Sequence, residues 1–277
     1  QTLAAMKMEH MKKVTPTYDL VVNSEHVQEA DEAGILEKVD WKPLLLKGTP
    51  SEVLNEVPSM SSGILTTTGY MGLMYNSDKI PAAEVPRSLS ALANPKWKGK
   101  VAIPTSASSY TRWSYYLGRE KVLADLRAIM KNEPIQGRYA DELNRYLLGE
   151  VWMAFITSQF MKLAQVKGMP TAWQSLDFGE LTDYSLTVSK GAAHPNAAKL
   201  LAVYLASPAG AKFTLEEAGG GNIYYPGNYE HDIRVQNRKQ GIREISNTRD
   251  EKMLKLILSK EYRQWQKEIK LVLQSRH

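Results

Sequence analysis

One stretch of this chain joins a short apolar run to a dense group of hydroxyl side chains. Val101-Ala102-Ile103 ends at Pro104, which predicts a short buried strand. Five hydroxyl residues within seven positions follow: Thr105, Ser106, Ser108, Ser109 and Thr111. Residues 110–117 have a helical pattern. A polar turn that opens a helix presents free N–H groups and a positive dipole end, so it favours anions or polar groups. Simple capping of the helix by Ser106 or Ser108 is the alternative.

The composition is ordinary for a globular protein large enough for one domain or two lobes. Of 277 residues, 43% are hydrophobic and 23% are charged. The sequence contains no apolar run of the ~18–20 residues that cross a bilayer. The first residues carry no charged-then-apolar pattern, so no targeting peptide is predicted.

The residue types present exclude several kinds of chemistry. The chain has no cysteine, which rules out disulfides, thiolate nucleophiles and cysteine-based metal sites. Its five histidines lie apart from one another, at His10, His26, His194, His231 and His277. None is spaced for metal binding, and no GxSxG or HExxH motif is present. Gly219-Gly220-Gly221 follows a helical segment and is read as a helix stop. We therefore expect no enzyme, no cofactor and no bound metal.

The positive charge is concentrated at the C-terminal end. Residues 233–277 contain 12 Lys/Arg and 5 Asp/Glu, a local charge of +7 within a chain whose total is +5. The basic residues alternate with acids on an amphipathic helical pattern, which is typical of a solvated helix face. We expect no nucleic-acid partner.

The order of patterns along the chain predicts an α/β fold. Helices are expected at residues 1–11, 27–33, 121–130, 141–148 and 195–205, and strands at 18–22, 150–157 and 184–188. Residues 63–76 form one long extended segment, interrupted by Gly69 and Gly72, that suits a strand passing between lobes. Ser158-Gln159 follows the apolar strand at 150–157 and opens another helix, giving a second polar strand end. Thr248 and Glu251 form a capping-box pattern before a long amphipathic C-terminal helix.

Several stretches, taken in order, resemble the periplasmic solute-binding proteins of ABC importers, in particular the iron-type and polyamine-type group. They are PTYDLVV, EAGILEKVDW, GYMGLMYNSDKIP, SLSALANPKWKGKVAIP, GEVWMAFITSQFMKLAQVKGMP and KGAAHPNAAKLLAVYLASPAGAKF. Together they span residues 16–221. The resemblance implies a two-lobed, type II periplasmic-binding fold that encloses a ligand by hinge closure.

The resemblance also implies domain boundaries. Two crossover strands are expected near residues 67–72 and 181–184. Residues 1–68 and 182–277 would form lobe I, and residues 69–181 would form lobe II. The family's opening strand and helix have no counterpart in this sequence.

Ligand residues follow from the same resemblance. The family's Ser-Gly-Thr ligand turn matches Ser106-Ala107-Ser108. Ferric-ion binders of this group carry two tyrosines after the lobe II strand, where this chain has Ser158-Gln159-Phe160. A small polar or anionic organic solute is therefore expected, with ferric iron and a synergistic anion as the alternative. An enzyme on the same scaffold is a further, weaker alternative.

The expected cleft residues are hydroxyl, amide, phenol and guanidinium side chains: Ser24, Thr68, Tyr70, Thr105, Ser106, Ser108, Tyr110, Arg112, Ser158, Gln159 and Tyr184. Two interpretations stay open for Arg112, which either pairs with a ligand carboxylate or is an exposed helix arginine. Tyr224-Tyr225 is read as loop packing or as a cleft wall. We expect a monomer that works with an inner-membrane permease, in the periplasm or tethered outside the cell.

Overall fold

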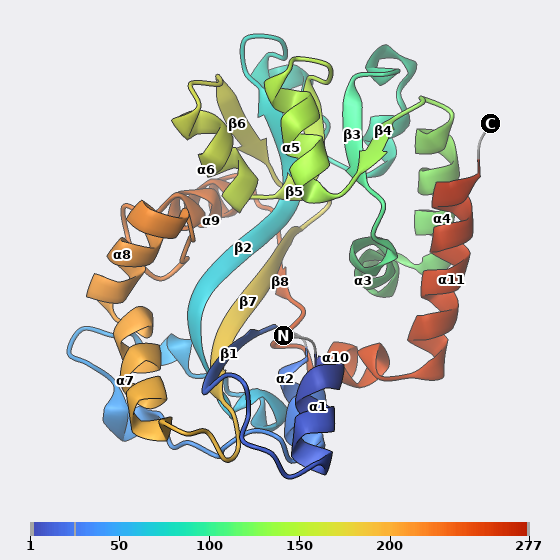
Figure 1. Cartoon of the computed structure of the whole chain (residues 1–277). Helices are drawn as coiled ribbons and strands as arrows, with labels where there is room; N and C mark the ends of the chain where they lie inside the picture. The colour runs from blue at the N-terminus through green and yellow to red at the C-terminus, as the bar shows by residue number, and fades with distance from the viewer. Residues whose placement is uncertain (1–2, 25, 276–277) are drawn as a thin grey trace. The chain divides into compact units, whose positions relative to one another are not determined.

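The computed structural model describes residues 3–24 and 26–275, and its course is shown in Figure 1. The chain divides into two compact units. Unit 1 comprises residues 1–69, 182–232 and 246–254, and unit 2 comprises residues 70–181, 233–245 and 255–277. The chain passes from unit 1 to unit 2 after Gly69 and returns after Leu181, and three further changes of unit follow in the C-terminal third.

The C-terminal third divides differently from the expectation, which assigned residues 182–277 to lobe I. Residues 233–245 and 255–277 belong to unit 2. The reason is hydrophobic packing: Ile269, Val272 and Leu273, on the last helix, are buried in the core cluster of unit 2. Burial of these apolar side chains stabilises the packing of the last helix on unit 2, although the preceding residues 246–254 belong to unit 1.

The helices and strands alternate, as the sequence pattern predicts. The α-helices are α1 (Leu3–Met11), α2 (Val27–Glu32), α3 (Ala107–Leu117), α4 (Arg119–Met130), α5 (Tyr139–Leu147), α6 (Gln159–Val166), α7 (Pro195–Ala206), α8 (Pro208–Ala218), α9 (Tyr229–Lys239), α10 (Glu251–Ile257) and α11 (Lys260–Gln274). The strands are β1 (Leu20–Asn23), β2 (Gly63–Asn76), β3 (Val101–Pro104), β4 (Ile135–Gly137), β5 (Met153–Thr157), β6 (Thr171–Gln174), β7 (Gly179–Val188) and β8 (Glu244–Ser246). Short 3₁₀ turns fill the long connections, including Ser90–Ala93 and Pro95–Trp97.

Unit 1 is built on the edge strand β1 and on parts of β7 and β2. β1 runs antiparallel to β7, with Leu20 opposite Val188. Its main core gathers Trp41, Ile64 and Val203 with their neighbours, and a second core lies between α1 and α2. α8 begins at Ser207, whose hydroxyl accepts a hydrogen bond from the Gly210 N–H at 3.2 Å. This is the N-cap that the Ser-Pro pair predicts.

Unit 2 contains the part of the sheet that matters for the candidate site. Its strand order is β2-β5-β3-β4, with β6 pairing with β2. β3 is parallel to both β4 and β5, whereas β5 is antiparallel to β2. The core packs around the fully buried Trp113, whose ring lies 5.1 Å from Phe155 and 4.6 Å from Phe178 between centroids.

The C-terminal segment differs from the sequence-based expectation in two details. One long helix was expected here, but the chain forms two, α10 and α11. Ser259 separates them and caps α11, since its hydroxyl accepts a hydrogen bond from the Tyr262 N–H at 3.0 Å. The capping box is also wrong. The Thr248 hydroxyl donates a hydrogen bond to Asp183 at 2.8 Å. The side chain of Asp250 caps α10 instead, since its Oδ1 accepts a hydrogen bond from the Lys252 N–H at 3.0 Å. Sequence spacing alone could not reveal Asp183 as the competing acceptor.

None of the helices within residues 3–24 and 26–275 is long and apolar enough to span a bilayer.

Candidate ligand-binding edge

Three parallel strands of unit 2 end at one edge of the sheet, and each leads into a helix. β3 opens α3, β4 opens α5 and β5 opens α6. Pro104 lies opposite Gly137, and Ala102 lies opposite Ala154, so the ends of the three strands are nearly level. The carboxyl ends of parallel strands are where open α/β sheets usually bind ligands. We call this place the carboxyl edge of unit 2.

The centre of this edge is the turn after β3. Thr105 is held by two hydrogen bonds to the Gly137 carbonyl, from its N–H at 2.9 Å and from its hydroxyl at 3.2 Å. Ser106 is exposed at the N-cap of α3, and within the described chain its side chain makes no capping hydrogen bond. The first N–H groups of an eleven-residue helix therefore lack an intrahelical acceptor, and the helix dipole adds partial positive charge.

The turn after β5 supplies a second polar group. Ser158 is fully buried, its N–H donates to the Tyr70 carbonyl at 2.9 Å, and its hydroxyl accepts from the Tyr70 N–H at 2.9 Å. Gln159, the first residue of α6, is exposed. Thr157 Oγ1 is buried and has no hydrogen-bond partner among the residues described, so this polar atom is free to meet a water or a ligand group.

Arg138 follows β4 and is a cation that the sequence analysis missed. Its side chain is 85% exposed, and its Nε lies 3.3 Å from Asp141 on the first turn of α5. That contact lowers the pKa of Asp141, through backbone and side-chain hydrogen bonds from Arg138. β4 has only three residues, which is too short for a periodic pattern, so no sequence signal marked the position as a strand end.

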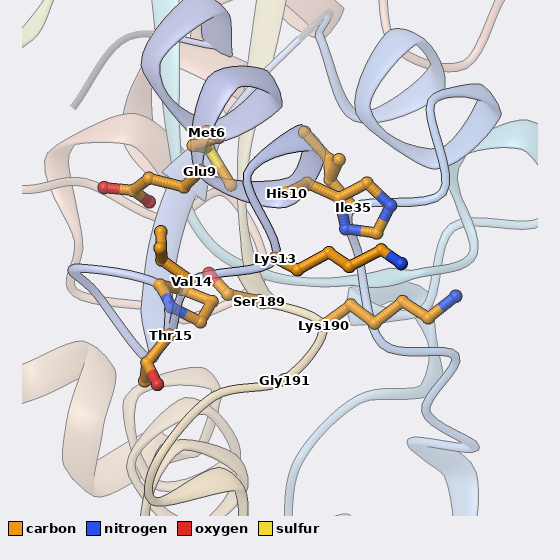
Figure 2. A pocket seen from close by; sticks show the side chains of 11 residues that line it. Met6, Glu9, His10, Lys13, Val14, Thr15, Ile35, Ser189, Lys190 and Gly191 are labelled. Carbon is orange, nitrogen blue, oxygen red and sulfur yellow. The ribbon is translucent and has the colours of Figure 1, made fainter.

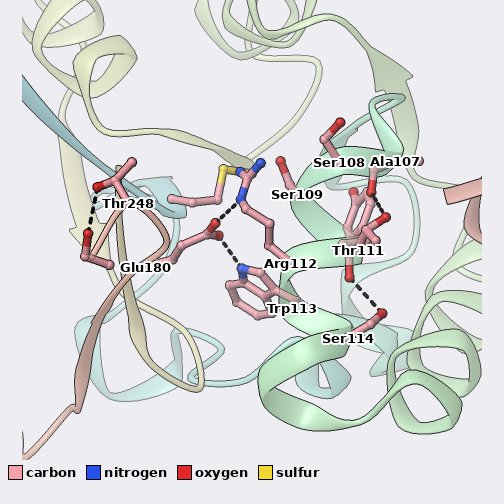
Figure 3. Close-up of polar contacts among 12 residues, drawn as sticks. Ala107, Ser108, Ser109, Thr111, Arg112, Trp113, Ser114, Glu180 and Thr248 are labelled. Atoms are coloured by element: carbon pink, nitrogen blue, oxygen red, sulfur yellow. Dashed lines mark hydrogen bonds and ion pairs between the residues drawn. The ribbon is translucent and has the colours of Figure 1, made fainter. Parts of the chain in front are cut away.

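Arg112 is not the exposed helix arginine that one interpretation of the sequence expects. It is buried, and its Nε lies 2.5 Å from Glu180 Oε1 (Figure 3). The other carboxylate oxygen of Glu180 accepts from the Trp113 indole N–H at 2.5 Å. Glu180 is itself completely buried. The guanidinium therefore neutralises an internal acid instead of standing exposed on the helix.

Two other expected ligand residues on α3 face their own unit. Tyr110 is fully buried in the core, and its hydroxyl donates to the Pro104 carbonyl at 3.3 Å. Burial raises the pKa of Tyr110 well above its ordinary value, with Glu142 and Tyr139 adding to the rise. The Ser108 hydroxyl lies 3.3 Å from Gln266 Nε2, on α11. These contacts place both residues in the packing around α3.

Tyr70 also lies inside unit 2. Its ring is buried, and its hydroxyl donates to Glu244, which in turn pairs with Arg234 at 3.1 Å. The remaining three expected residues, Ser24, Thr68 and Tyr184, belong to unit 1.

Those three unit 1 residues have distinct settings. Thr68 is buried and its hydroxyl accepts from the Ile223 N–H at 3.0 Å. Tyr184 is partly exposed on β7, and its carbonyl accepts from Thr66 Oγ1 at 3.4 Å. Ser24 follows β1 and its carbonyl accepts from the Val27 N–H at 3.3 Å. Thr68 thus holds the loop at Ile223 in place.

The tyrosine pair at 224–225 serves loop packing. The Tyr225 hydroxyl donates to the Ala206 carbonyl at 2.6 Å, and burial raises the pKa of Tyr225 to about 12. Tyr224 is partly buried, with the Arg249 guanidinium 5.8 Å from its ring centroid. A phenol that is hydrogen-bonded and hard to ionise is a poor metal ligand. Within the described residues, no group of three or more His, Cys, Asp or Glu could hold a metal ion.

Comparisons with known proteins agree with this architecture. The iron-bound HitA of Pseudomonas aeruginosa is 20% identical, with a TM-score of 0.65, covering 81% of this chain and 74% of that one. The spermidine/putrescine transporter substrate-binding protein PotD of Streptococcus pneumoniae is 14% identical, with a TM-score of 0.72 and coverage of 99% and 90%. An ABC-transporter substrate-binding protein from Agrobacterium tumefaciens is 11% identical, with a TM-score of 0.76 and coverage of 99% and 84%.

These structural similarities, with TM-scores of 0.65 to 0.76, establish the type II periplasmic-binding fold. A search of curated protein sequences gives no significant match. The family profile described as bacterial extracellular solute-binding protein matches residues 2–228, which is most of the sequence. The chain belongs to the family of bacterial extracellular solute-binding proteins.

Proposed function

We propose that this chain is the substrate-binding component of an ABC importer and that it binds a small polar or anionic organic solute at the carboxyl edge of unit 2. It delivers the solute to a membrane permease from the periplasm or the outer cell surface. Family membership and the transporter-associated relatives support this role. Binding and release, without turnover, are what the residues at the edge can perform.

The observation that carries the proposal is the convergence of three strand ends. They bring the exposed Ser106 turn, the Ser158-Gln159 turn and the Arg138 guanidinium to the same edge of one sheet. The N–H groups that open α3 suit a carboxylate or another oxyanion, and the exposed guanidinium of Arg138, which pairs with Asp141, adds further N–H donors. Gln159 offers a neutral amide for the polar remainder of the solute.

The edge is held in place before any ligand arrives. Thr105 is fixed to Gly137, and Ser158 is fixed to Tyr70, by the hydrogen bonds already described. The buried Arg112–Glu180 pair secures α3 against β7 inside unit 2. Because these turns are already fixed, little backbone freedom is lost on binding, and the site gains affinity from this preorganisation.

Ferric iron with a synergistic anion is a second candidate, favoured by the iron-bound structure among the relatives. Ser158-Gln159-Phe160 at the start of α6 offers no phenolate to a metal. Adding Fe(III) with citrate or carbonate to the purified protein tests this candidate. We expect no tyrosinate absorbance, and a coloured protein would favour iron over the organic solute.

A thermal-shift screen of carboxylates, phosphonates, amines and metal chelates tests the proposed function. A ligand present at about 100 times its Kd stabilises the folded state by about 2.7 kcal/mol, which raises the Tm of a chain of this size by about 5 °C. We expect a hit among the anionic or zwitterionic compounds. A screen without any stabilising compound would contradict the proposal.

A further inference from the structure

A cavity of about 350 Å³ lies in unit 1, far along the sequence from the residues of the carboxyl edge. It is formed by α1, the segment that follows it, Ile35 and the loop after β7 (Figure 2). Met6 and Ile35 are buried and form its apolar lining, together with Val14 and Pro16. The volume is at the lower end of the range of about 300–1,000 Å³ that is typical of small-ligand sites.

Cationic side chains dominate the polar part of this cavity. Lys13 and Lys190 run in the same direction in Figure 2, with the His10 ring beside them. Neither lysine forms an ion pair with another residue in the described part of the chain, and both are exposed. The Lys190 backbone is fixed by its N–H, which donates to the Ile35 carbonyl at 2.9 Å.

The cavity lining also contains one acid, Glu9, which offsets part of the charge of the two lysines without forming an ion pair with either of them in the described part of the chain. Glu9 points away from both lysines in Figure 2, and its carboxylate accepts hydrogen bonds from the N–H and the hydroxyl of Thr17. With two ammonium groups and one carboxylate, the lining keeps a net positive charge that attracts an external anion.

The backbone at Lys13 is a second, independent observation. Its φ is +53°, and its N–H donates to the His10 carbonyl at 3.0 Å as α1 ends. A helix that ends in the left-handed conformation usually has glycine at this position, since a side chain makes the conformation costly. Lys13 has this unfavourable backbone conformation, and its side chain lines the cavity.

We propose that this cavity binds a small organic carboxylate, with the apolar body against Met6 and Ile35 and the anionic end between Lys13 and Lys190. This site is separate from the carboxyl edge, since all its residues belong to unit 1. It gives the chain a second anion site that does not depend on the proposed transport ligand.

Benzoate and its neutral analogue benzamide test the proposal by calorimetric titration of the full chain at low ionic strength. We expect saturable benzoate binding, no comparable benzamide binding, and a loss of about tenfold in benzoate affinity in both Lys13→Gly and Lys190→Met. Lys13→Gly relieves the backbone cost, so its Tm should rise while binding falls. This variant separates loss of the site from loss of the fold.

Two controls make the test specific. Lys12→Met removes a neighbouring exposed cation that does not line the cavity, and it should keep wild-type affinity. Ala107→Pro alters the carboxyl edge of unit 2 and should also leave benzoate binding unchanged. Absence of saturable benzoate binding, equal binding of benzamide, unchanged affinity in both cavity variants, or an equal loss in Lys12→Met would overturn the proposal. A benzoate affinity lowered by Ala107→Pro would assign the binding to the edge and overturn it too.

Discussion

Arg112 and Glu180 form a buried ion pair in unit 2, with Arg112 Nε 2.5 Å from Glu180 Oε1. Glu180 is fully enclosed, and its second oxygen is bonded to the Trp113 indole. The pair joins α3 to β7, so the helix that opens at Ser106 is fixed by a charge contact in the interior of its own unit.

Removing only one member of this pair should strongly destabilise the protein. Arg112→Met leaves the buried Glu180 carboxylate without its neutralising charge, which typically costs about 3–5 kcal/mol of unfolding free energy. Urea denaturation measures the change. The double variant Arg112→Met/Glu180→Gln removes both charges and should recover a large part of the loss. Equal stability of single and double variants would contradict this account.

Glu142 should make stability depend on pH. It is fully buried on α5, both carboxylate oxygens lack hydrogen-bond partners among the described residues, and burial raises its pKa to about 9 from 4.5. The folded state therefore holds a proton that the unfolded state releases above pH 4.5. Its contribution to stability is complete below pH 4.5 and is lost as the pH rises to about 9.

The variant Glu142→Gln should have a flatter stability profile between these two pH values. Denaturant midpoints measured at pH 5, 7 and 9 test this, with Glu217→Gln as an exposed control. The control should follow the wild-type profile. If Glu142→Gln and wild type lose the same stability over this range, then Glu142 is not the group responsible.

The start of α8 offers a test of local capping. The Ser207 hydroxyl accepts from the Gly210 N–H and donates to the Tyr204 carbonyl at 2.6 Å. Ser207→Ala should cost about 1 kcal/mol of unfolding free energy, whereas Ser207→Asp should retain most of the cap because its carboxylate can accept the same N–H. Thermal or urea unfolding of both variants distinguishes these values. An alanine variant as stable as wild type would exclude the cap.

Arg138 should contribute to ligand affinity but little to folding. Its guanidinium is exposed, and its contact with Asp141 is a solvent-screened surface pair that contributes little to folding. Arg138→Gln should weaken binding of an anionic ligand about tenfold with a nearly unchanged Tm. Arg145→Gln, on the helix α5 that follows Arg138, is the matched control and should bind normally. A similar loss in both variants would mean that only the general charge matters.

The sequence predicted strands and helices well where the pattern was long and strongly apolar. The segment 63–76 forms one strand with the expected limits, and the start of β3 and the end of α7 differ by no more than one residue from the prediction. α9 was missed because Tyr229–Lys239 is polar along most of its length. β4 and β8 were missed because three residues give no periodicity.

The candidate site was predictable in part. The turn at Ser106 follows from a strand end beside hydroxyl residues, and the structure places it at the carboxyl edge. The partner of Arg112 could not be predicted, because Glu180 lies 68 positions away and reaches it only through the sheet. Arg138 could not be predicted as a site residue either, because its position at the edge depends on the pairing of β4 with β3.

We propose that the N–H groups opening α3 bind the polar end of the solute, and the variant Ala107→Pro removes one of these groups. Ala107 is the first residue of the helix, where proline fits, and Ser106 has the extended conformation that precedes proline (φ −71°, ψ 119°). The variant removes one N–H donor and retains the helix. We predict about a tenfold loss of affinity for the solute that gives the largest thermal shift, measured by calorimetry, with the Tm of the free protein unchanged. Wild-type affinity in this variant would contradict the account.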